Sequence, residues 1–446
     1  MTDGYSIAAA SVGITPERPI PLAGYATLRK PTFERVADPL EANVAILRRG
    51  TEVVAFISLD LMYVGAQLRD ALLTTLAGKL PREAVFTTAC HTHSGPPTED
   101  SLPILGTVTP EYRSMVARRV GDLVLRLLSG PFEPVTLQYL EGRATHSVNR
   151  RRRVFGVSRH FPFIGPQVRL GPNPEGRRDE TIRLLRIRSA DGKDRIICWC
   201  YACHPVGYPQ LNDVTAEYPG VVRSLLRAEY GEIPVIFWQG FSGNVGPRQV
   251  VSSSNGDAAH PRYSLQAVSL ADWQEWARTL GQCVTATAGA AAGHSIDGPI
   301  DCSLRALSLR ELGLETDKQI RLHEIRLGSD LVICGLNAEV AVEYVDVFQK
   351  LHAPAHVFPV GCVGDVYGYL PNDAMVREGG YEASGFVRRF GLKGSFLPTV
   401  ERIVTERLLD DRTAVPSEAQ RRAASATGAA VKRSGDHPAP ADGMDL

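Results

Sequence analysis

Ala-Cys-His-Thr-His-Ser-Gly-Pro at residues 89–96 is the stretch from which the fold and chemistry of this chain are best inferred. It follows the strand-like run 84–88, so two histidines come where a buried strand opens into a loop. Side chains two residues apart on a strand share a face, and α/β proteins place ligand-binding residues at strand ends. We therefore expect His91 and His93 to point into one space. There, both imidazoles could bind a metal, or one could bind it while the other moves a proton.

The composition is that of an ordinary globular protein. The chain has 446 residues, 44% of them hydrophobic, and a formal net charge of zero. The balanced charge argues against a nucleic-acid partner, which would need a basic face. No apolar run is long enough to span a bilayer, and the N-terminus lacks the basic and apolar regions of a secretory signal. We expect a cytoplasmic protein without stable membrane association, whose cysteines are buried and reduced.

Alternating strand and helix patterns predict an α/β fold in which mixed β-sheets are flanked by helices. Strands are expected at 5–14, 41–48, 52–61, 84–88, 135–139, 181–187, 195–202, 234–239, 304–309, 323–327, 330–336 and 356–362. Helices are expected at 67–80, 111–128, 218–230, 270–292, 340–351 and 399–409. The alternation is too irregular for an eight-fold (β/α) barrel. Residues 1–411 are expected to form one domain, and the Ala-, Ser-, Gly- and Pro-rich segment 412–446 a disordered tail.

Further polar residues stand at strand and loop boundaries. His204 follows the strand at 195–202, and Glu339 follows the strand at 330–336, where it would begin a helix and be favoured by the helix dipole. Tyr369 and Tyr381 are twelve residues apart in a Gly-rich region. Arg150 opens a run of four arginines, any of which could point inward. Asp60, at the end of another strand, is a candidate to orient a ligand histidine.

Taken together, these residues resemble the neutral, non-lysosomal ceramidase family of zinc-dependent amidases. The resemblance covers the family's N-terminal catalytic domain and runs over about residues 5–400 of this chain. Its motifs occur here in the family's order: His91-Thr92-His93-Ser94-Gly95-Pro96, Asn149-Arg150, Ala202-Cys203-His204-Pro205, Leu336-Asn337-Ala338-Glu339, and Tyr369 with Tyr381 before Glu382-Ala383-Ser384. The first motif is fairly specific, and the others gain weight from their order.

The resemblance implies a neutral-ceramidase-like catalytic domain with one Zn²⁺ and hydrolysis of an amide bond by zinc-bound water. The implied zinc ligands are His91, His204, Glu339 and Tyr369. The implied catalytic residues are His93 as general base, with Tyr381 and Arg150 stabilising the tetrahedral oxyanion.

The chain also departs from the family pattern. The family loop Gly-Asp-Val-Ser-Pro reads Gly-Asn-Val-Gly-Pro here, so Asn244 and Gly246 replace its aspartate and serine. Nearby Ser242 lacks the glycine spacing of a nucleophile elbow. Segment 154–178 differs as well and, as a long loop, is a candidate to cover the pocket. We also expect no counterpart of the family's C-terminal immunoglobulin-like domain or of its secretion signal.

These departures lead us to expect a small acylated substrate rather than ceramide itself. Three alternatives stay open: an acyltransferase that forms amides, an esterase or lactonase on the same site, and a scaffold that kept the fold and lost catalysis. The sequence does not indicate an oligomeric state.

Overall fold

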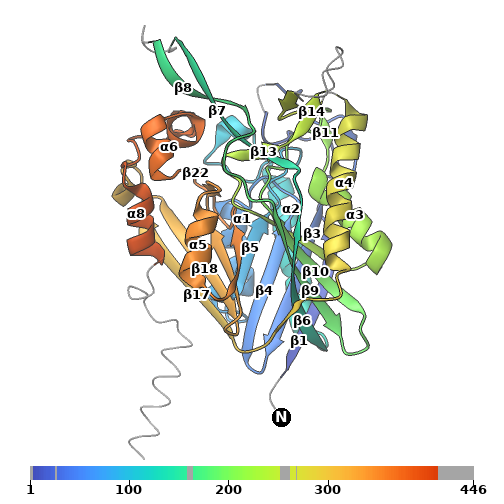
Figure 1. The fold of residues 1–446 in the computed structure, drawn as a ribbon. Coiled ribbons are helices and arrows are strands. Elements are labelled where there is room, and N and C mark those ends of the chain that lie inside the picture. The colour runs from blue at the N-terminus through green and yellow to red at the C-terminus, as the bar shows by residue number, and fades with distance from the viewer. Residues whose placement is uncertain (1–3, 26–27, 158–163, 252–261, 268, 410–446) are drawn as a thin grey trace, which may run out of the picture.

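The computed structural model describes residues 4–25, 28–157, 164–251, 262–267 and 269–409 (Figure 1). The predicted tail at 412–446 lies outside these residues. The described part is a mixed α/β structure, as the sequence predicts.

The main sheet has nine strands in the order β12-β10-β9-β6-β1-β3-β4-β5, with β16 also paired to β6. Its strands are β1 (Tyr5–Gly13), β3 (Glu41–Arg49), β4 (Glu52–Leu59), β5 (Val85–Ala89), β6 (Glu133–Arg143), β9 (Thr181–Ser189), β10 (Asp194–Tyr201), β12 (Val235–Gln239) and β16 (His294–Ile296). The two end pairs, β4–β5 and β10–β12, are parallel, and the other pairs are antiparallel. The Ser58 hydroxyl of β4 donates to the Phe237 carbonyl of β12 at 3.0 Å. The two ends of the sheet therefore approach each other.

A second sheet of four strands packs on one face of the main sheet. Its order is β17-β18-β19-β21, with β17 (Ile300–Ser308), β18 (Gln319–Leu327), β19 (Leu331–Leu336) and β21 (His356–Val360). Alternate residues of both sheets, such as Phe56, Trp238 and Phe358, share one buried apolar cluster. Isolated bridges between Thr88 and Val363 and between Gly240 and Val360 connect the sheets at the ends of the strands. The ends of β5, β12 and β21 are thus fixed beside one another.

Helices cover the outer faces (Figure 1). Helices α1 (Ala66–Leu76) and α2 (Pro110–Ser129) lie on the β1–β5 half of the main sheet, and α3 (Tyr218–Tyr230) and α4 (Leu270–Ala288) lie on the β9–β12 half. On the outer side of the second sheet are α5 (Tyr344–His352), α6 (Asp373–Glu378), α7 (Phe386–Arg389) and α8 (Val400–Val404). None of the helices in the described part of the chain combines the length and apolar character needed to cross a bilayer.

Short elements and one long hairpin complete the fold. Strands β7 (Ser147–Val157) and β8 (Ile164–Asn173) form a hairpin that projects at the top of Figure 1, and β13 (Val245–Pro247) pairs with β7. Further two-stranded pairs are β2 (Arg35–Val36) with β11 (Asp213–Val214), β14 (Gln249–Val251) with β15 (Arg262–Ser264), and β20 (Glu339–Val340) with β22 (Tyr369–Leu370). Single turns are η1 (Arg82–Ala84), η2 (Pro103–Leu105), η3 (Leu309–Leu312), η4 (Tyr381–Gly385) and η5 (Thr405–Leu409).

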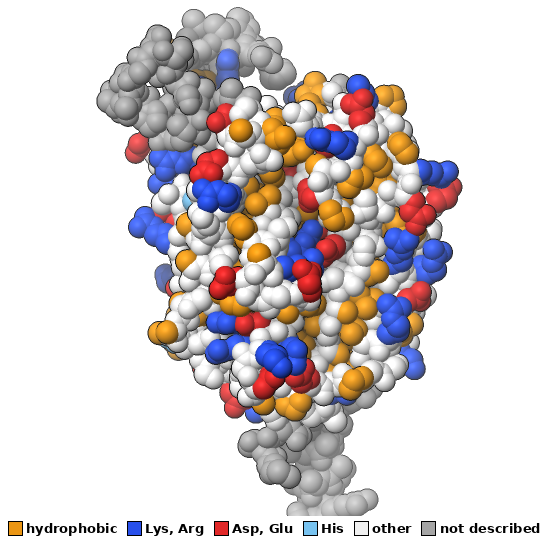
Figure 2. Space-filling view, turned by 90° about the vertical axis from the view of Figure 1, so that its right-hand side faces the viewer, with side chains coloured by type: hydrophobic (Ala, Val, Ile, Leu, Met, Phe, Trp, Pro, Cys, Tyr) orange, Lys and Arg blue, Asp and Glu red, His pale blue; other side chains and the backbone are white. Residues whose placement is uncertain are grey.

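Several predicted boundaries were wrong. The helix expected at 340–351 begins only at Tyr344, the helix at 67–80 ends at Leu76, and the helix at 399–409 is α8 followed by the π-turn η5. Much of segment 154–178, expected to be loop, belongs to the β7–β8 hairpin, because long antiparallel pairing compensates for its weak strand pattern. Figure 2 shows basic and acidic side chains mixed over one face of the molecule.

Candidate metal centre

His91 and His93 lie just beyond the end of β5, in the loop that follows it. Strand β5 ends at Ala89, and His91 adopts a left-handed backbone with φ of 69°. The N–H of His91 donates to the Leu61 carbonyl at 2.9 Å, which holds the loop against the end of β4. The expectation that the two histidines share a strand face was therefore wrong, because both lie in the loop beyond the strand. The two imidazoles still converge, with their Nε2 atoms 3.4 Å apart.

The other predicted ligands arrive from two further places. His204 follows β10, while Glu339 and Tyr369 stand directly opposite each other in the short parallel pair β20–β22. The prediction that Glu339 begins a helix was wrong, because Glu339 lies in β20 and α5 begins five residues later. Strand pairing, rather than a helix dipole, places this carboxylate beside Tyr369.

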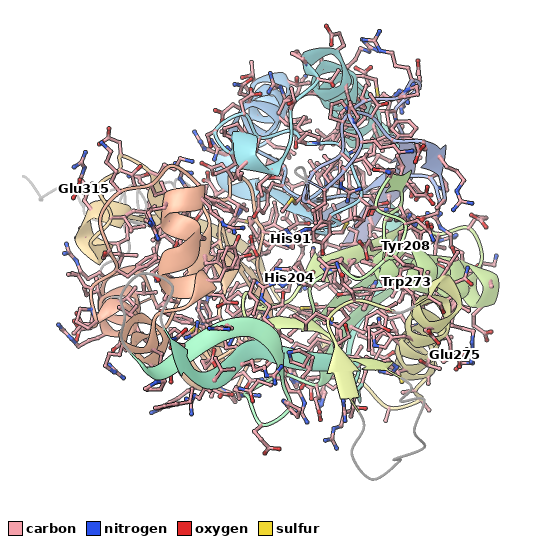
Figure 3. The ribbon with its side chains drawn as sticks, turned by 90° about the horizontal axis from the view of Figure 1, so that it is seen from above. His91, His204, Tyr208, Trp273, Glu275 and Glu315 are labelled. Atoms are coloured by element: carbon pink, nitrogen blue, oxygen red, sulfur yellow. The ribbon has the colours of Figure 1, made fainter. Side chains whose placement is uncertain are left out.

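Donor atoms from these segments meet at one buried point. His204 Nε2 lies 2.8 Å from Glu339 Oε2, and His91 Nε2 lies 3.5 Å from the same oxygen. His91 and His204 are each 1% exposed, and Glu339 is 4% exposed. Figure 3 shows His91 and His204 beside each other near the middle of the molecule. Single ligand atoms of His91, His93 and His204 also lie within 4.8 Å of one another, so the group can hold a metal ion.

The outer nitrogens of both ligand histidines are held by main-chain carbonyls. His91 Nδ1 lies 3.0 Å from the Met62 carbonyl, and His204 Nδ1 lies 2.7 Å from the Ser242 carbonyl. A carbonyl only accepts, so each Nδ1 carries a proton and Nε2 is the nitrogen that faces the centre; in the neutral ring this Nε2 has the free lone pair. The Tyr63 hydroxyl donates to Glu339 Oε1 and leaves Oε2 facing the histidines. Such outer contacts orient the ligands of metal sites.

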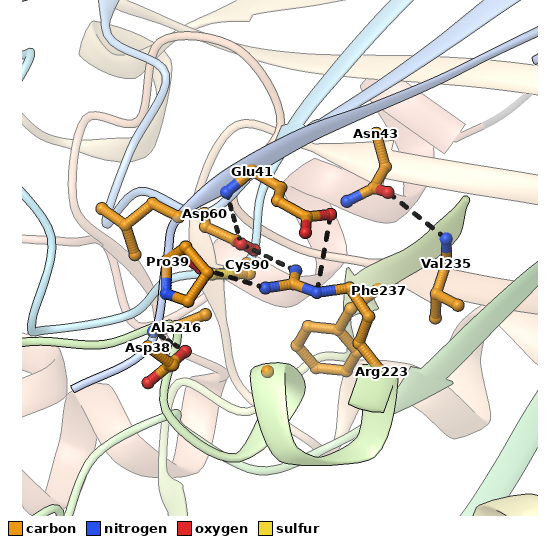
Figure 4. A network of polar contacts seen from close by, with 12 residues as sticks. Asp38, Pro39, Glu41, Asn43, Asp60, Cys90, Ala216, Arg223, Val235 and Phe237 are labelled. Carbon is orange, nitrogen blue, oxygen red and sulfur yellow. Dashed lines mark hydrogen bonds and ion pairs between the residues drawn. The ribbon is translucent and has the colours of Figure 1, made fainter. Parts of the chain in front are cut away.

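Asp60 does not contact either histidine, so its predicted role was wrong. Its Oδ2 accepts from the N–H of Glu41 at 2.9 Å and from Arg223 Nη1 at 2.7 Å. Figure 4 shows this buried network, in which Arg223 also faces Glu41. Asp60 therefore balances a buried arginine, and the orienting role falls to the Met62 carbonyl three residues from the strand end.

Among the four consecutive arginines, Arg150 is the one whose side chain reaches Tyr369. Its Nη2 lies 3.1 Å from the Tyr369 hydroxyl and 2.6 Å from the Gly243 carbonyl, and its Nε donates to Glu382 at 3.0 Å. Arg151 is also buried and pairs with Glu382 from the other side, whereas Arg152 and Arg153 are exposed. The ring centroids of Tyr381 and Tyr369 are 5.4 Å apart. All seven predicted site residues therefore lie in one cluster.

The residues of the cluster differ in the direction in which their pKa values are shifted. Burial, together with the nearby His91 and His204, holds the pKa of His93 well below its usual range. Burial would raise the pKa of Glu339, but His91 and His204 hold it well below its ordinary value. Burial and the charge of Glu339 raise the pKa of Tyr381, so its hydroxyl keeps its proton. The site thus contains a neutral imidazole, a carboxylate and a phenol donor.

Comparisons with known proteins show which solved structures have a similar fold. No protein-family model and no curated protein matches this sequence. The solved structure of neutral ceramidase from Pseudomonas aeruginosa aligns with a TM-score of 0.68 at 14% identity, over 94% of this chain and 77% of that chain. This chain has the neutral ceramidase fold. A structure of a ceramidase complexed with C2 aligns equally, with a TM-score of 0.68 at 15% identity, over 93% of this chain and 77% of that one.

Within the ceramidase fold, the two departures in the Gly-rich loop have structural explanations. Gly246 lies in β13 opposite Val148 and offers no nucleophile. Asn244 is fully buried, its Oδ1 accepts from the Val342 N–H at 2.8 Å, and its amide donates to Glu343. Asn244 therefore fixes the segment that follows Glu339. Ser242 contributes its carbonyl to His204, while its hydroxyl contacts Gln239.

Sequence reasoning missed several residues around this site of the ceramidase fold. Tyr63 supports Glu339, while Tyr25, Arg29 and Glu217 lie on the side of His93. No short motif marks them. Glu217 and Cys362 share one trait with His91: in the described part of the chain they are the three non-glycine residues with positive φ. Such strained backbones cluster at functional sites, but they are seen only in the structure.

Proposed function

We propose that this chain is a metal-dependent amidase, with zinc as the metal, that hydrolyses the amide bond of a small acylated substrate. The observation that carries the proposal is the convergence of His91 Nε2, His204 Nε2 and Glu339 Oε2, with both Nδ1 atoms bound to carbonyls. The ceramidase fold supports the reaction class, because the similar solved structures are those of ceramidases.

The donor set fits a zinc ion. Two neutral imidazoles and one carboxylate are ordinary zinc ligands, and Tyr369, opposite Glu339 in the strand pair, supplies a fourth ligand atom, its phenolic oxygen. Glu339 is a buried carboxylate whose ion-pair partners in the described part of the chain are histidines, so a cation at this point would balance its charge. When bound, zinc acidifies water and polarises a carbonyl.

His93 is assigned as the general base. Its imidazole is neutral, its Nε2 faces His91, and its Nδ1 is buried without a hydrogen-bond partner in the described structure. It accepts a proton from the attacking water and returns it to the nitrogen of the leaving amine. A neutral leaving amine is essential because an amide anion is a very poor leaving group.

Arg150 and Tyr381 are assigned to the oxyanion that forms from the amide carbonyl. Arg150 is buried and held in position by Glu382 and the Gly243 carbonyl, so its guanidinium does not reorganise during the reaction. Tyr381 keeps its proton and can donate a hydrogen bond. Fixed donors in a dry site stabilise developing negative charge more than mobile water does.

Metal analysis and a substrate panel test this function. Protein purified without added metal is expected to contain about one zinc per chain, and a panel of N-acyl amines that includes ceramide is expected to contain hydrolysed members. His91→Ala, His204→Ala and Glu339→Gln are expected to lose both zinc and turnover. The matched control is His294→Ala, an exposed histidine outside the cluster. Full turnover of a zinc-free, chelator-treated protein would contradict the proposal, as would cleavage of esters with no amide cleaved.

A further inference from the structure

A second group of polar side chains lies beside His93 and has no part in the proposed metal binding. It consists of Tyr25, Arg29, Ser94 and Glu217, and we call it the Arg29–Glu217 cluster. Arg29 donates to the main-chain carbonyl of His93, and the ring of Tyr25 lies 5.5 Å from the imidazole of His93. The Ser94 hydroxyl donates to Glu217 Oε1 at 3.4 Å. The residues His93 and Ser94 therefore join this cluster to the reacting centre.

The Arg29–Glu217 cluster contains buried polar atoms without partners. Three of its buried atoms have no hydrogen-bond partner in the described part of the chain: Arg29 Nε, Arg29 Nη1 and Glu217 Oε2. The Glu217 side chain belongs to a residue that is only 1% exposed. A buried polar group without a partner costs free energy, so native proteins rarely keep one unless a ligand completes it.

Backbone strain points to the same residue. Glu217 has a φ of 56°, in the left-handed region that a glutamate rarely adopts. In the described chain, the other two non-glycine residues of this kind are His91, a proposed metal ligand, and Cys362, whose side chain interacts with His91. The Thr215 hydroxyl accepts from the Glu217 N–H at 2.8 Å, which holds this conformation. Strain held in this way indicates a side chain whose direction matters for function.

The atoms without hydrogen-bond partners indicate which chemical group the cluster binds. Arg29 offers two N–H donors and a positive charge, for which a carboxylate is the natural partner. Burial raises the pKa of Glu217 to about 8, so at neutral pH its carboxyl group holds a proton and donates to the same anion. Because the cluster adjoins His93, which returns the proton to the leaving nitrogen, the ligand group belongs to the amine half of the substrate.

We propose that Arg29 and Glu217 bind a carboxylate carried by the leaving amine, so that the substrate is an N-acyl amino acid. This inference rests on the proposed function. Water adds to the amide carbon, the C–N bond breaks, and the nitrogen takes up the proton that His93 removed from water. The products are the free carboxylic acid and the amino acid, with no other reactant consumed.

Three matched amides of octanoic acid test the inference: N-octanoylglycine, N-octanoylethylamine and N-octanoylethanolamine. On the CH2 group next to the nitrogen they carry a carboxylate, a methyl group or a hydroxymethyl group, respectively. We expect kcat/KM for N-octanoylglycine to exceed that for the ethylamide by about 100-fold, because sites built around a polar group discriminate strongly against analogues that lack it. Equal rates, or a preference for the ethanolamide, would overturn the inference.

Substitutions test whether the Arg29–Glu217 cluster causes the preference for a carboxylate. Arg29→Gln is expected to reduce the ratio of kcat/KM between N-octanoylglycine and the ethylamide by at least about tenfold. Glu217→Gln, which keeps the shape and a donor, is expected to reduce this ratio less. Arg18→Gln, an exposed arginine of the same N-terminal region, is the control and leaves the ratio unchanged. An unchanged ratio in Arg29→Gln would overturn the inference.

A binding measurement separates this inference from the proposed function. In zinc-loaded His93→Ala, calorimetry is expected to detect N-octanoylglycine and to show at least about tenfold weaker binding after Arg29→Gln is added. Melting temperatures of both variants verify folding, and Arg29→Lys serves if Arg29→Gln does not fold. If the ethylamide is hydrolysed but no carboxylate preference exists, only this inference fails. If no amide is hydrolysed and no zinc is present, the proposed function fails.

Discussion

Two buried groups in the described part of the chain contain the residue types of a metal site, and they differ in how the carboxylate is neutralised. One is the His91–His204–Glu339 centre, and the other is formed by Glu324, Cys334 and His352 in the second sheet and α5. Glu324 is held by Arg305 at 2.9 Å and by Arg326 at 2.7 Å. In the described part of the chain, Glu339 forms ion pairs with two imidazoles, those of His91 and His204, and with no arginine or lysine.

The comparison shows that ligand types alone do not define a metal centre. A buried carboxylate must be balanced, and two guanidinium groups do this for Glu324 without a metal. At Glu339 the protein supplies two imidazoles oriented by carbonyls, and in the function proposed above a bound cation balances the carboxylate. We therefore expect the two groups to respond oppositely to the same substitution.

The largest expected difference comes from replacing each carboxylate by its amide. Glu339→Gln is expected to remove the metal and to lower kcat/KM by about 10³-fold or more, since both the nucleophile and the charge stabilisation are lost. Glu324→Gln is expected to keep the metal while lowering the free energy of unfolding by about 3 kcal/mol, because Arg305 and the partly exposed Arg326 each lose their ion pair with this buried carboxylate. Elemental analysis, kinetics and denaturant unfolding measure these effects. Loss of metal in Glu324→Gln alone would reverse the assignment.

A smaller effect on activity is expected within the first group, from His93→Ala. Loss of the general base is expected to lower kcat by about 10²- to 10⁴-fold, while metal content stays at the wild-type value. The control is His204→Ala, which is expected to lose both. If His93→Ala also lost its metal, His93 would be a ligand, as the proximity of the three histidine ligand atoms allows.

Chelation is expected to change stability in a way that depends on the first group only. A ligand that binds the folded state stabilises it by about 4 kcal/mol at a thousand times its Kd, which corresponds to a fall of about 5 °C in Tm on removal from a chain of this length. Glu339→Gln should show no further fall with chelator, whereas Glu324→Gln should respond like the wild type. Differential scanning calorimetry with and without chelator measures this. Equal Tm values for the chelated and untreated wild type would argue against a resident metal.

The smallest expected effect comes from Tyr63→Phe, which removes one hydrogen bond to Glu339 without changing shape. Loss of an outer contact to a metal ligand typically weakens metal affinity by about 10- to 100-fold. A competition titration with a chromogenic chelator measures the change. The control is Tyr367→Phe, a buried tyrosine whose hydroxyl has no partner in the described chain. Equal affinities in both variants would show that Tyr63 does not support the site.

Much of the architecture could be predicted because it depends on local pattern. The apolar runs that form β4, β5, β10, β12 and β19 lie where the sequence places them, and α3 has the predicted bounds. The resemblance motifs also identified Arg150 among four arginines, and the structure places it against Tyr369. The alternation of buried and exposed residues along a strand would not have identified Arg150, because the neighbouring residues Arg150 and Arg151 are both buried in β7.

The sequence by itself determined where most of the buried strands lie, the histidine motif and the residue types of the site, because hydrophobic periodicity and turn residues act over a few positions. Only the tertiary structure decided that Glu339 pairs with Tyr369 across two short strands, and that main-chain carbonyls rather than Asp60 orient the histidines. It also decided that Arg29 and Glu217, 188 positions apart by their residue numbers, meet beside His93. Such contacts arise from sheet pairing and burial between distant segments, which no local pattern records.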